Sequence, residues 1–413
     1  MHEIAVIGGG LTGLMTATAL SFAMPSPAAA RIVLIDRATR DAPPADERTT
    51  TIHAAGARML AAMGVWERLA APPAPVMRVA VAEGPPPTGL AARRRPASDL
   101  SWQAADTPMG YVVANGDLQN ALRATLMTRP VEEIRGVAVA GWQADDGLAE
   151  LTLDMPDGGR RMVTALAVAC DGARSRMAEM AGLPLREERQ HQTAIVTTIH
   201  AERHHGDTAY QRFLPGGPFA LMPGPGNAMS LVWTLPNEKA SQLSIAEEQV
   251  FESACMDAFG TSLGYLRLAG DRLAWPLRPS WRRGITAPAM VLAGDAAHAI
   301  HPLAGQGYNL ALGDAAILAD CLHATLRRGL TPDHPSLRNG YEAARLPERL
   351  AMTTATSGLN RLFSGAPPLL RRAAGIGFSL LDRVPAKSLF SDVAEGGALA
   401  DAALLRGRLP GGG

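Results

Sequence analysis

The sequence predicts an α/β fold in which a parallel sheet with its helices is interleaved with an antiparallel sheet and followed by a helical C-terminal region. Three observations support this prediction. A short β-branched apolar run opens the chain and leads through a glycine-rich turn into a helix-like stretch. Two further apolar runs, far along the chain, end in Asp-Gly and in Gly-Asp. The segments "TAIVTTIHA" and "MSLVWTL" alternate as antiparallel strands do.

The chain has 413 residues, more than one compact core usually holds, so we expect two interleaved domains. Residues 72–110 and 180–280 lack a strand–helix–strand rhythm and are expected to form the second domain. The expected first domain is discontinuous and comprises residues 1–71, 111–179 and 281–335, and residues 336–413 form the C-terminal helical region.

Composition narrows the class of protein. Basic and acidic residues both number 39, and a nucleic-acid binder would normally carry a basic excess, so we expect no nucleic-acid partner. The three cysteines are far apart and have neither metal-ligand nor disulfide spacing, which fits a reducing cytoplasm. The N-terminus lacks the features of a signal peptide, and we find no apolar run long enough to span a membrane. A cytoplasmic protein is therefore expected.

The first glycine-rich turn lies in a strand–helix–strand unit. Gly8, Gly10 and Gly13 follow the apolar run Ile4–Ile7 at GxGxxG spacing, and a second apolar run ends on Asp36. This order is the Rossmann-type dinucleotide fingerprint: the glycines allow a tight turn, close approach of a pyrophosphate and close helix packing, while the acid binds ribose hydroxyls. The unit does not separate NAD from FAD, and a glycine-rich turn without a ligand is the alternative.

The Asp-Gly and Gly-Asp motifs lie at two further strand ends. Asp171-Gly172 is followed by Ser175, and Gly294-Asp295 ends the run 289–293. Ligands bind at the carboxyl ends of strands in open α/β sheets, so Asp295 is expected to accept hydrogen bonds from a sugar-like chain. We expect a close turn over 302–307 and a helix from Asn309 onward. Gly305 and Gly307 would expose N–H groups at its start, where the helix dipole stabilises the negative charge of a reduced flavin.

Two histidines, His298 and His301, raise the question of a metal site. Their spacing suits one face of a helix, but Pro302 and the nearby glycines disfavour a helix there, and no Asp, Glu or Cys completes a ligand set. We expect no metal and a structural or substrate-facing role for these histidines.

With these motifs in this order, the chain resembles the group A FAD-dependent aromatic monooxygenases. Their fold is the hydroxybenzoate-hydroxylase subclass of the glutathione-reductase-like FAD-binding fold. Within that family the chain is most similar to the ubiquinone-biosynthesis hydroxylases, such as 2-polyprenylphenol hydroxylases. The stretches that carry the closer resemblance are "DERTTTIHAAGARMLAAMGVW", "GYVVANGDLQNAL", "QRFLPGGPFALMP", "GDAAHAIHPLAGQGYNLAL" and "TATSGLNRLFS".

The resemblance implies FAD as cofactor, NAD(P)H or a redox partner as electron donor, and O₂ and a polyprenylphenol as substrates. The ring would be hydroxylated through a C4a-hydroperoxyflavin. Arg48 would lie near the flavin and its pyrophosphate, Gln119 beside the flavin tail, and Asp171 and Asp295 at the cofactor. The residues expected to line the isoalloxazine are Pro302, Gly305, Gln306, Gly307 and Asn309. His301 and Pro302 are the candidate catalytic contacts, His301 as an aid to phenol ionisation, with a packing role as the alternative.

Two positions depart from the family pattern. The Asp-Gly motif usually continues to an arginine where this chain has Ala178, and Gly313 stands where the family often has arginine before Asp314. The first departure bears on NAD(P)H use, because that motif handles both cofactor and nicotinamide. It also favours one alternative function, a non-catalytic flavoprotein subunit of a quinone-biosynthesis complex. A hydroxylase of a small aromatic acid is the other alternative.

The expected antiparallel domain supplies candidates for an apolar substrate wall, each of which has a plain sheet-core interpretation as alternative. They are Phe213, Phe219, Leu221, Met222 and Trp233. The tail 367–390 alternates apolar pairs with basic residues, which is compatible with peripheral contact at the inner face of a membrane or with an ordinary docked helix.

Overall fold

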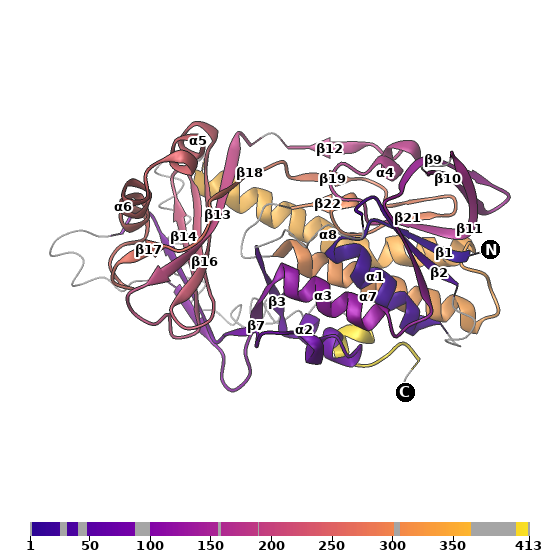
Figure 1. Ribbon diagram of the computed structural model, residues 1–413, viewed down its shortest axis with the longest axis horizontal. Coiled ribbons are helices and arrows are strands. Elements are labelled where there is room, and N and C mark those ends of the chain that lie inside the picture. Colours follow the sequence, from indigo (N-terminus) through magenta and orange to yellow (C-terminus); the bar gives the residue numbers. More distant parts are fainter. Residues whose placement is uncertain are drawn as a thin grey trace.

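A computed structural model describes residues 2–24, 31–39, 48–86, 100–155, 158–188, 190–300, 306–364 and 402–411. Two large sheets lie toward opposite ends of the long axis, and the helices α1, α3 and α7 lie against the first of them (Figure 1). The first large sheet has the order β20-β21-β11-β1-β2-β8, with β9 and β10 attached beside β11. Its strands are β1 (His2–Ile7), β2 (Ile32–Asp36), β8 (Val131–Arg135), β9 (Ala138–Asp145), β10 (Leu148–Asp154), β11 (Arg160–Ala169), β20 (Thr286–Ala287) and β21 (Met290–Leu292).

The centre of the first sheet is parallel, as the apolar runs predict. β1 pairs in parallel with β11 and β2, and β11 pairs in parallel with β21. Such strands are covered on both faces, so they need continuous apolar sequence rather than alternation. Every residue of β2 is buried, including its last residue, Asp36. This confirms the predicted strand–helix–strand unit, and β2 ends on Asp36 as the second apolar run predicts.

The second large sheet is mostly antiparallel and has the order β17-β13-β16-β15-β14-β5-β6, with β18 also paired to β13. The two segments predicted as alternating strands are β13 and β16, and they pair antiparallel over their whole length. The strands are β5 (Arg78–Glu83), β6 (Leu100–Gln103), β13 (Gln192–Ala201), β14 (Thr208–Leu214), β15 (Gly217–Pro223), β16 (Ala228–Pro236), β17 (Leu266–Leu268) and β18 (Leu273–Pro276).

Two small sheets complete the strands. One has the order β3-β7-β4 and the other β12-β19-β22. Their strands are β3 (Thr49–His53), β4 (Ala74–Val76), β7 (Gly110–Ala114), β12 (Leu185–Glu187), β19 (Ser280–Arg282) and β22 (His298–Ala299). The helices are α1 (Leu11–Ala23), α2 (Ala54–Ala62), α3 (Asn115–Leu126), α4 (Arg176–Met180), α5 (Asn237–Ile245), α6 (Glu248–Phe259), α7 (Gln306–Arg327) and α8 (Pro335–Ser364), with short 3₁₀ turns η2 (Trp66–Arg68), η4 (Gly294–Ala296) and η6 (Leu404–Arg406).

The long helix α8 links the two parts of the molecule. It packs along α7 beside the first sheet and also contacts β14 and β15 of the second sheet (Figure 1). Part of the predicted C-terminal helical region is thus helix, whereas the basic stretch 367–390 lies outside the described residues. No helix in the described ranges is long and apolar enough to cross a membrane.

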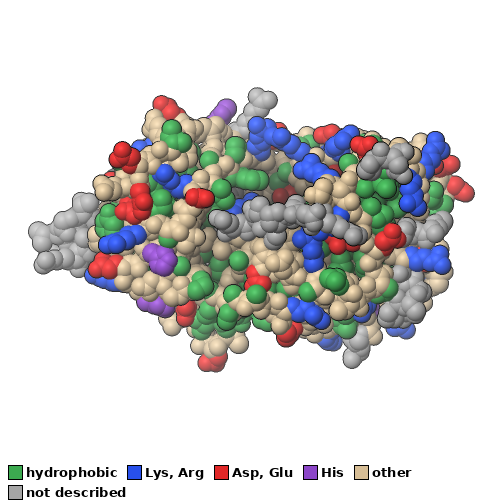
Figure 2. All heavy atoms as spheres, viewed as in Figure 1, with side chains coloured by type: hydrophobic (Ala, Val, Ile, Leu, Met, Phe, Trp, Pro, Cys, Tyr) green, Lys and Arg blue, Asp and Glu red, His purple; other side chains and the backbone are tan. Residues whose placement is uncertain are grey.

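The apolar core is divided by the sheets. One cluster covers both faces of the first sheet and includes α1 and α7. A second fills the space between one face of the second sheet and α5 and α6. A small third cluster joins the opposite face of the second sheet to β4 and β7. Acidic and basic side chains are interspersed over the face seen in Figure 2, as the net charge of zero leads one to expect.

Candidate functional site

The three sequence motifs meet at one edge of the first sheet. Ile7, the last residue of β1, lies beside Ile35 of β2 and Ala169 of β11, and Ala169 lies beside Leu292 of β21. Parallel strands end at a common edge, so the segments that follow each strand are brought side by side. The glycine turn, Asp36, the Asp-Gly motif and the Gly-Asp motif are therefore neighbours, although up to 287 residues separate Gly8 from Asp295.

The glycine turn is shaped by contacts that leave no room for side chains. Gly8 has φ +107, and a Cβ there would lie 2.5 Å from the Cys170 carbonyl oxygen. A Cβ on Gly13 would overlap the Gly8 carbonyl oxygen, so Gly13 lets α1 lie directly on the turn. Gly10 differs, because a Cβ there would meet no described atom within 4 Å. Gly8 and Gly13 serve packing, and Gly10 keeps a space open.

That open space lies at the N-terminus of α1. Gly10 is the N-cap residue and no side chain caps the helix. The first N–H groups of a helix have no partner within the helix, and the dipole there favours negative charge. An uncapped, glycine-bordered N-terminus is the arrangement that binds a pyrophosphate.

Asp36 and Gln119 flank the turn. Asp36 is buried at the end of β2, and its Oδ1 accepts a hydrogen bond of 3.2 Å from the Ala38 N–H. Its carboxylate also occupies the space next to Gly9, where a Cβ would collide with it. Gln119, on α3, donates from Nε2 to the Gly9 carbonyl at 3.4 Å. Both residues thus contact the glycine turn.

Asp171 follows β11 and carries an unsatisfied oxygen. Its Oδ2 accepts a 3.2 Å hydrogen bond from the Met177 N–H, whereas the buried Oδ1 has no partner among the described residues. Ser175 caps α4 by accepting from the Ala178 N–H at 3.0 Å. Ala178 itself is completely buried in the main core. An arginine at this position would have to enter that core.

Asp295 lies at the mouth of the site. Gly294 has φ +61, and its Cβ would contact Thr12 of α1 at 2.6 Å, so the Gly-Asp motif rests directly on the helix that follows the glycine turn. Asp295 is reached by solvent, yet the protein surrounds it closely enough that desolvation raises its pKa, with His298 and Arg48 opposing the rise. Arg48 lies with its guanidinium carbon 4.8 Å from the ring centroid of Trp275 on β18.

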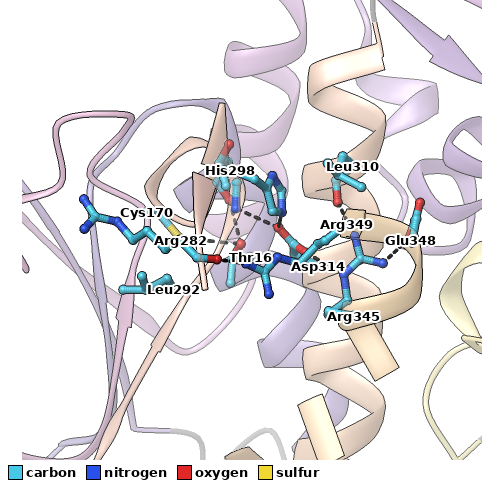
Figure 3. A network of polar contacts seen from close by, with 12 residues as sticks. Thr16, Cys170, Arg282, Leu292, His298, Leu310, Asp314, Arg345, Glu348 and Arg349 are labelled. Atoms are coloured by element: carbon cyan, nitrogen blue, oxygen red, sulfur yellow. Dashed lines mark hydrogen bonds and ion pairs between the residues drawn. The ribbon is translucent and has the colours of Figure 1, made fainter. Parts of the chain in front are cut away.

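A buried network of charged side chains is hydrogen-bonded to the Gly-Asp motif (Figure 3). Asp314 of α7 accepts a 2.8 Å hydrogen bond from the Gly294 N–H, and its Oδ2 lies 2.9 Å from Nε2 of His298. Its Oδ1 lies 2.6 Å from Nε of Arg345 on α8. Burial acts to raise the pKa of Asp314, but His298, Arg345 and the Gly294 N–H outweigh it and hold the pKa well below the ordinary value.

The network extends along α8. Arg345 also bonds the Glu348 carboxylate and, at 3.0 Å, the Leu310 carbonyl. Arg349 donates to the Arg282 carbonyl at 2.6 Å, and Arg282 donates from Nε to the Ala296 carbonyl at 3.0 Å. His298 therefore has a structural environment, in line with one of the two roles expected for it.

The start of α7 lies earlier than the sequence predicted. The helix begins at Gln306 rather than Asn309, so Gly307 lies in its first turn, with no described atom within 4 Å of a Cβ placed there. Asn309 bridges α7 and β3: its Nδ2 donates to the Thr51 carbonyl at 2.7 Å and its Oδ1 accepts from the His53 N–H at 2.9 Å. His301, Pro302 and Gly305 lie outside the described residues, and for Gln306 only the backbone is described.

The candidate wall residues divide between two faces of the second sheet. Phe219, Leu221 and Trp233 pack in the cluster beneath α5 and α6, so their sheet-core interpretation fits the structure. Met222 belongs to the small cluster that faces β4 and β7, and by strand alternation Phe213 shares that face. Only the latter two face the part of the molecule that carries the motifs.

Sequence reasoning missed several residues. Arg345, Glu348 and Arg349 have the spacing of a charged helix face, which normally indicates solvent exposure, yet both arginines are buried. Gln211 on β14 is also buried and was not singled out. The signal that could have identified them is a polar residue at a position that the strand or helix periodicity predicts to be buried.

The residues at this edge fit an FAD. The uncapped α1 N-terminus with open Gly10 suits the pyrophosphate, Asp36 suits the adenosine ribose, and the unsatisfied Oδ1 of Asp171 offers one more acceptor. Asp295 offers a solvent-reached carboxylate for the hydroxyls of the ribityl chain. The open first turn of α7, at Gly307, suits the flavin ring.

Comparisons with known proteins agree with this geometry. A family model described as FAD binding domain matches residues 1–356. The chain is 36% identical over 396 residues to ubiquinone hydroxylase UbiL of Rhodospirillum rubrum, an alignment covering 94% of this chain and 88% of that protein. It is 31% identical over 390 residues to 3-demethoxyubiquinol 3-hydroxylase of Escherichia coli, covering 92% and 95%. Identity to human ubiquinone biosynthesis monooxygenase COQ6 is 28% over 433 residues, covering 91% and 89%.

Solved structures share the fold. The crystal structure of p-nitrophenol 4-monooxygenase PnpA from Pseudomonas putida DLL-E4 superposes with a TM-score of 0.76 at 19% identity, covering 96% of this chain and 99% of that chain. PqsL of Pseudomonas aeruginosa in complex with 2-aminobenzoylacetate gives a TM-score of 0.72 at 20% identity, covering 91% and 99%. At these identities the likeness concerns the fold alone.

The fold and the family are those of an FAD-dependent aromatic hydroxylase. The chain belongs to the FAD-binding domain family, and its relatives at 36% and 31% identity are hydroxylases of ubiquinone biosynthesis. The family resemblance, the fold class and the FAD cofactor expected from the sequence are thereby confirmed.

Proposed function

We propose that this enzyme hydroxylates the aromatic ring of a polyprenylated phenol in ubiquinone biosynthesis, with O₂ as oxidant and NAD(P)H or a redox partner as electron donor. The observation that carries the proposal is the meeting of the glycine turn, the Asp-Gly motif and the Gly-Asp motif at one sheet edge, opposite an apolar sheet face. The names of the relatives supply the substrate class. Bound FAD supplies the activation of O₂ and the oxygen transfer.

The residues of the chain would bind and orient. The α1 N-terminus and Gly10 would hold the pyrophosphate, Asp36 the ribose, and Asp171 and Gln119 the segment between them. Asp295 would hold the ribityl chain, with Arg48 beside it. Asn309, whose amide bonds the Thr51 carbonyl and the His53 N–H of β3, would position these two residues beside the cofactor. His301, Pro302, Gly305 and Gln306 remain candidates for contact with the ring system.

The second sheet would cover the reacting ring. Its face toward β4 and β7 is apolar, with Ala220, Met222 and Val232 among its residues. An apolar cover excludes water, which protects a reactive oxygen donor from decay. We propose Phe213 and Met222 as substrate contacts on this face, and we retain the division into an FAD-binding domain (1–71, 111–179 and 281–335), a substrate domain (72–110 and 180–280) and a C-terminal region (336–413) as part of the proposal.

The test is a direct assay. Purified protein should retain FAD, and a short-chain prenylated phenol should stimulate NAD(P)H oxidation and gain one oxygen atom, which mass spectrometry detects as a mass increase of about 16 Da, the mass of one oxygen atom. Incubation with ¹⁸O₂ should place the label in the product. A small aromatic acid serves as the comparison substrate, and efficient hydroxylation of that acid in place of the phenol would contradict the proposal.

One observation favours a second candidate, a flavoprotein subunit without turnover of its own. Ala178 occupies a buried position where the family motif carries an arginine, and that motif also serves the nicotinamide donor. Such a subunit would bind FAD but show no phenol-stimulated NAD(P)H oxidation alone, and it would gain activity when partner proteins of ubiquinone biosynthesis are added.

We also propose peripheral contact with a membrane, because a polyprenyl tail dissolves in lipid. Flotation of the full chain, and of a chain lacking residues 367–390, with anionic vesicles tests this contact. Failure of the full chain to float with the vesicles would contradict it.

A further inference from the structure

Gln211, on β14, carries a buried amide for which the described residues offer no hydrogen-bond partner. Its side chain is 7% exposed, and neither Nε2 nor Oε1 has a hydrogen-bond partner in the part of the chain that the structure describes. Leaving a buried amide unsatisfied costs free energy, and such groups are few in native proteins. A group outside the chain that satisfies both atoms would explain why an amide is kept at this position.

The register of the second sheet shows which way Gln211 faces. Gln211 is paired with Ala220 of β15, and Ala220 packs in the small cluster with Ala74 of β4. Directly paired residues of an antiparallel ladder share a face. Gln211 therefore faces the small sheet β3-β7-β4, whose strand β3 is fixed to the start of α7 by Asn309.

The contact between Arg48 and Trp275 marks the same face. Trp275 is paired with Ala194 on β13. Val196, two positions after Ala194, is paired with Val232, and Val232 is paired with Ala220. Trp275 and Ala220 thus share a face by strand alternation. Arg48 immediately precedes β3 and is the residue that the family pattern places beside the flavin. Two independent contacts therefore orient this face toward the cofactor.

The neighbours of Gln211 on this face are apolar and mostly small. Ala209 precedes it by two residues, Ala220 lies across from it, and Met222 follows Ala220 by two. An apolar surface with one precisely placed polar group is the usual composition of a small-molecule site. A ring bound beside these residues would meet the Gln211 amide, and the Ser230 hydroxyl lies on the same face farther along, opposite Met222.

We propose that Gln211 recognises two adjacent oxygen substituents on the substrate ring. This inference rests on the proposed function and deepens it. An amide presents one acceptor and one donor side by side, and a single hydroxyl cannot satisfy both with good geometry. A ring with a hydroxyl next to an ether or second hydroxyl supplies a proton to Oε1 and an oxygen to Nε2. The preferred substrate is then a phenol already oxygenated at the neighbouring carbon, so an earlier ring hydroxylation must supply it.

The chain offers a matched control on the same sheet. Gln192, on β13, is also 7% exposed, but its Nε2 donates to the Gly216 carbonyl at 3.0 Å. Replacing Gln192 by leucine removes a satisfied hydrogen bond, whereas replacing Gln211 by leucine removes an unsatisfied amide. The two variants therefore separate a structural role from a role toward the ligand.

The experiment compares FAD-loaded wild type, Gln211→Leu, Gln211→Met and Gln192→Leu on two probes, 2-prenylphenol and 2-methoxy-6-prenylphenol. We expect wild type to favour the methoxyphenol by about tenfold or more in kcat/KM, mainly through KM. The Gln211 variants should lose this preference and form less product per NAD(P)H oxidised, with unchanged or higher Tm. Gln192→Leu should keep the preference and lower Tm. Titrating each probe against the flavin absorption spectrum measures the same preference without turnover.

The outcomes are distinguishable. A wild type that hydroxylates neither phenol overturns the proposed function, and the inference with it. A wild type that hydroxylates both equally, or Gln211 variants that keep the wild-type preference, overturn the inference and leave the proposed function standing. A lower Tm for the Gln211 variants with unchanged probe preference would assign the amide to internal structure, and this also overturns the inference.

Discussion

Arg345 and Asp314 form a fully buried ion pair, with 2.6 Å between Nε and Oδ1, that joins helix α8 to helix α7, which carries part of the proposed flavin site. Asp314 also holds the Gly294 N–H and lies against His298. The position of the Gly-Asp motif thus depends on a residue of a different helix, 51 positions after Gly294.

Removing the positive charge of Arg345 should lower the stability of the folded protein. Arg345→Ala leaves the Asp314 carboxylate buried with too little compensating charge, and breaking such a pair from one side costs about 3–5 kcal/mol. We expect a loss of this size in the free energy of unfolding, measured by urea titration, together with faster loss of FAD. Arg328→Ala, at an exposed position just after α7, is the control and should change stability by less than about 0.5 kcal/mol. Equal effects of the two substitutions would contradict a special role for Arg345.

Even an alanine at position 313 should lower the stability of the protein. A Cβ there would lie 2.9 Å from Nη1 of Arg345, whose guanidinium is held by Asp314 and the Leu310 carbonyl. Gly313→Ala is therefore expected to destabilise the protein, although in a helix interior alanine is generally about 1 kcal/mol more stable than glycine. In Gly340→Ala, on α8, the Cβ would lie 3.6 Å from Sγ of Cys321, an ordinary contact, so this variant should be stabilised. Thermal unfolding of both variants tests the contrast, and a stabilised Gly313→Ala would refute it.

His53 should make the protein acid-sensitive. Burial lowers the pKa of His53 from 6.5 to about 4. Between these two pH values the imidazole is therefore mostly neutral in the folded state and mostly protonated in the unfolded state. Above pH 6.5 the residue has no effect. As pH falls from 6.5 toward 4, stability should decline by roughly 1.4 kcal/mol per pH unit from this group.

His53→Gln should remove that part of the pH dependence in unfolding curves measured between pH 7 and 4. His204→Gln, at an exposed position, should leave the dependence unchanged. An identical pH slope for wild type and His53→Gln would show that His53 titrates normally.

Two substitutions in the glycine turn should separate an effect on FAD binding from an effect on folding. Gly10→Ala places a Cβ in open space, so the apoprotein should keep its Tm, but the methyl group occupies the room expected for the pyrophosphate and FAD affinity should fall by about tenfold or more. Gly13→Ala collides with the Gly8 carbonyl and should unfold the apoprotein itself. Fluorescence titration with FAD and apoprotein melting curves distinguish the two. Normal FAD affinity for Gly10→Ala would argue against the proposed pyrophosphate site.

Restoring the missing arginine of the Asp-Gly motif should not improve the enzyme. Ala178 is completely buried, and Ala178→Arg would bury an unpaired charge, which costs more than about 3 kcal/mol. We expect insoluble or strongly destabilised protein. The neighbouring exposed position provides the control, because Glu179→Arg should be tolerated. Soluble Ala178→Arg protein with improved NAD(P)H oxidation would refute this prediction and strengthen the subunit interpretation of the natural alanine.

The strand ends could be predicted because their signal is local. Continuous apolar runs before Gly8, Asp171 and Gly294 identify buried parallel strands, and parallel strands end at one edge. The sequence predicts that α7 starts at Asn309, because glycines and a proline favour a turn before it, whereas the helix starts at Gln306. Gly307 instead lies in the first helical turn, where a missing side chain costs least and leaves the helix end open.

The buried charges and the sheet faces could not be predicted from local pattern. Arg345 and Glu348 have the spacing of an exposed pair, and only the packing of α8 on α7 buries Arg345. In the second sheet, alternation separates Phe219 and Leu221 from Ala220 and Met222, but it does not say which set faces the flavin side. Phe219 and Leu221 pack under α5 and α6, whereas Ala220 and Met222 face β4 and β7.

The order in which the ribosome delivers these segments follows from the position of α8. The glycine turn emerges about three hundred residues before Asp314, and Asp314 emerges before Arg345. A nascent chain that stops before residue 345 carries every sequence motif of the cofactor site, yet the carboxylate that anchors the Gly-Asp turn lacks its main counter-charge. The proposed nucleotide pocket can therefore be completed only after residue 345 has been synthesised, so a chain that stops before it should bind FAD weakly.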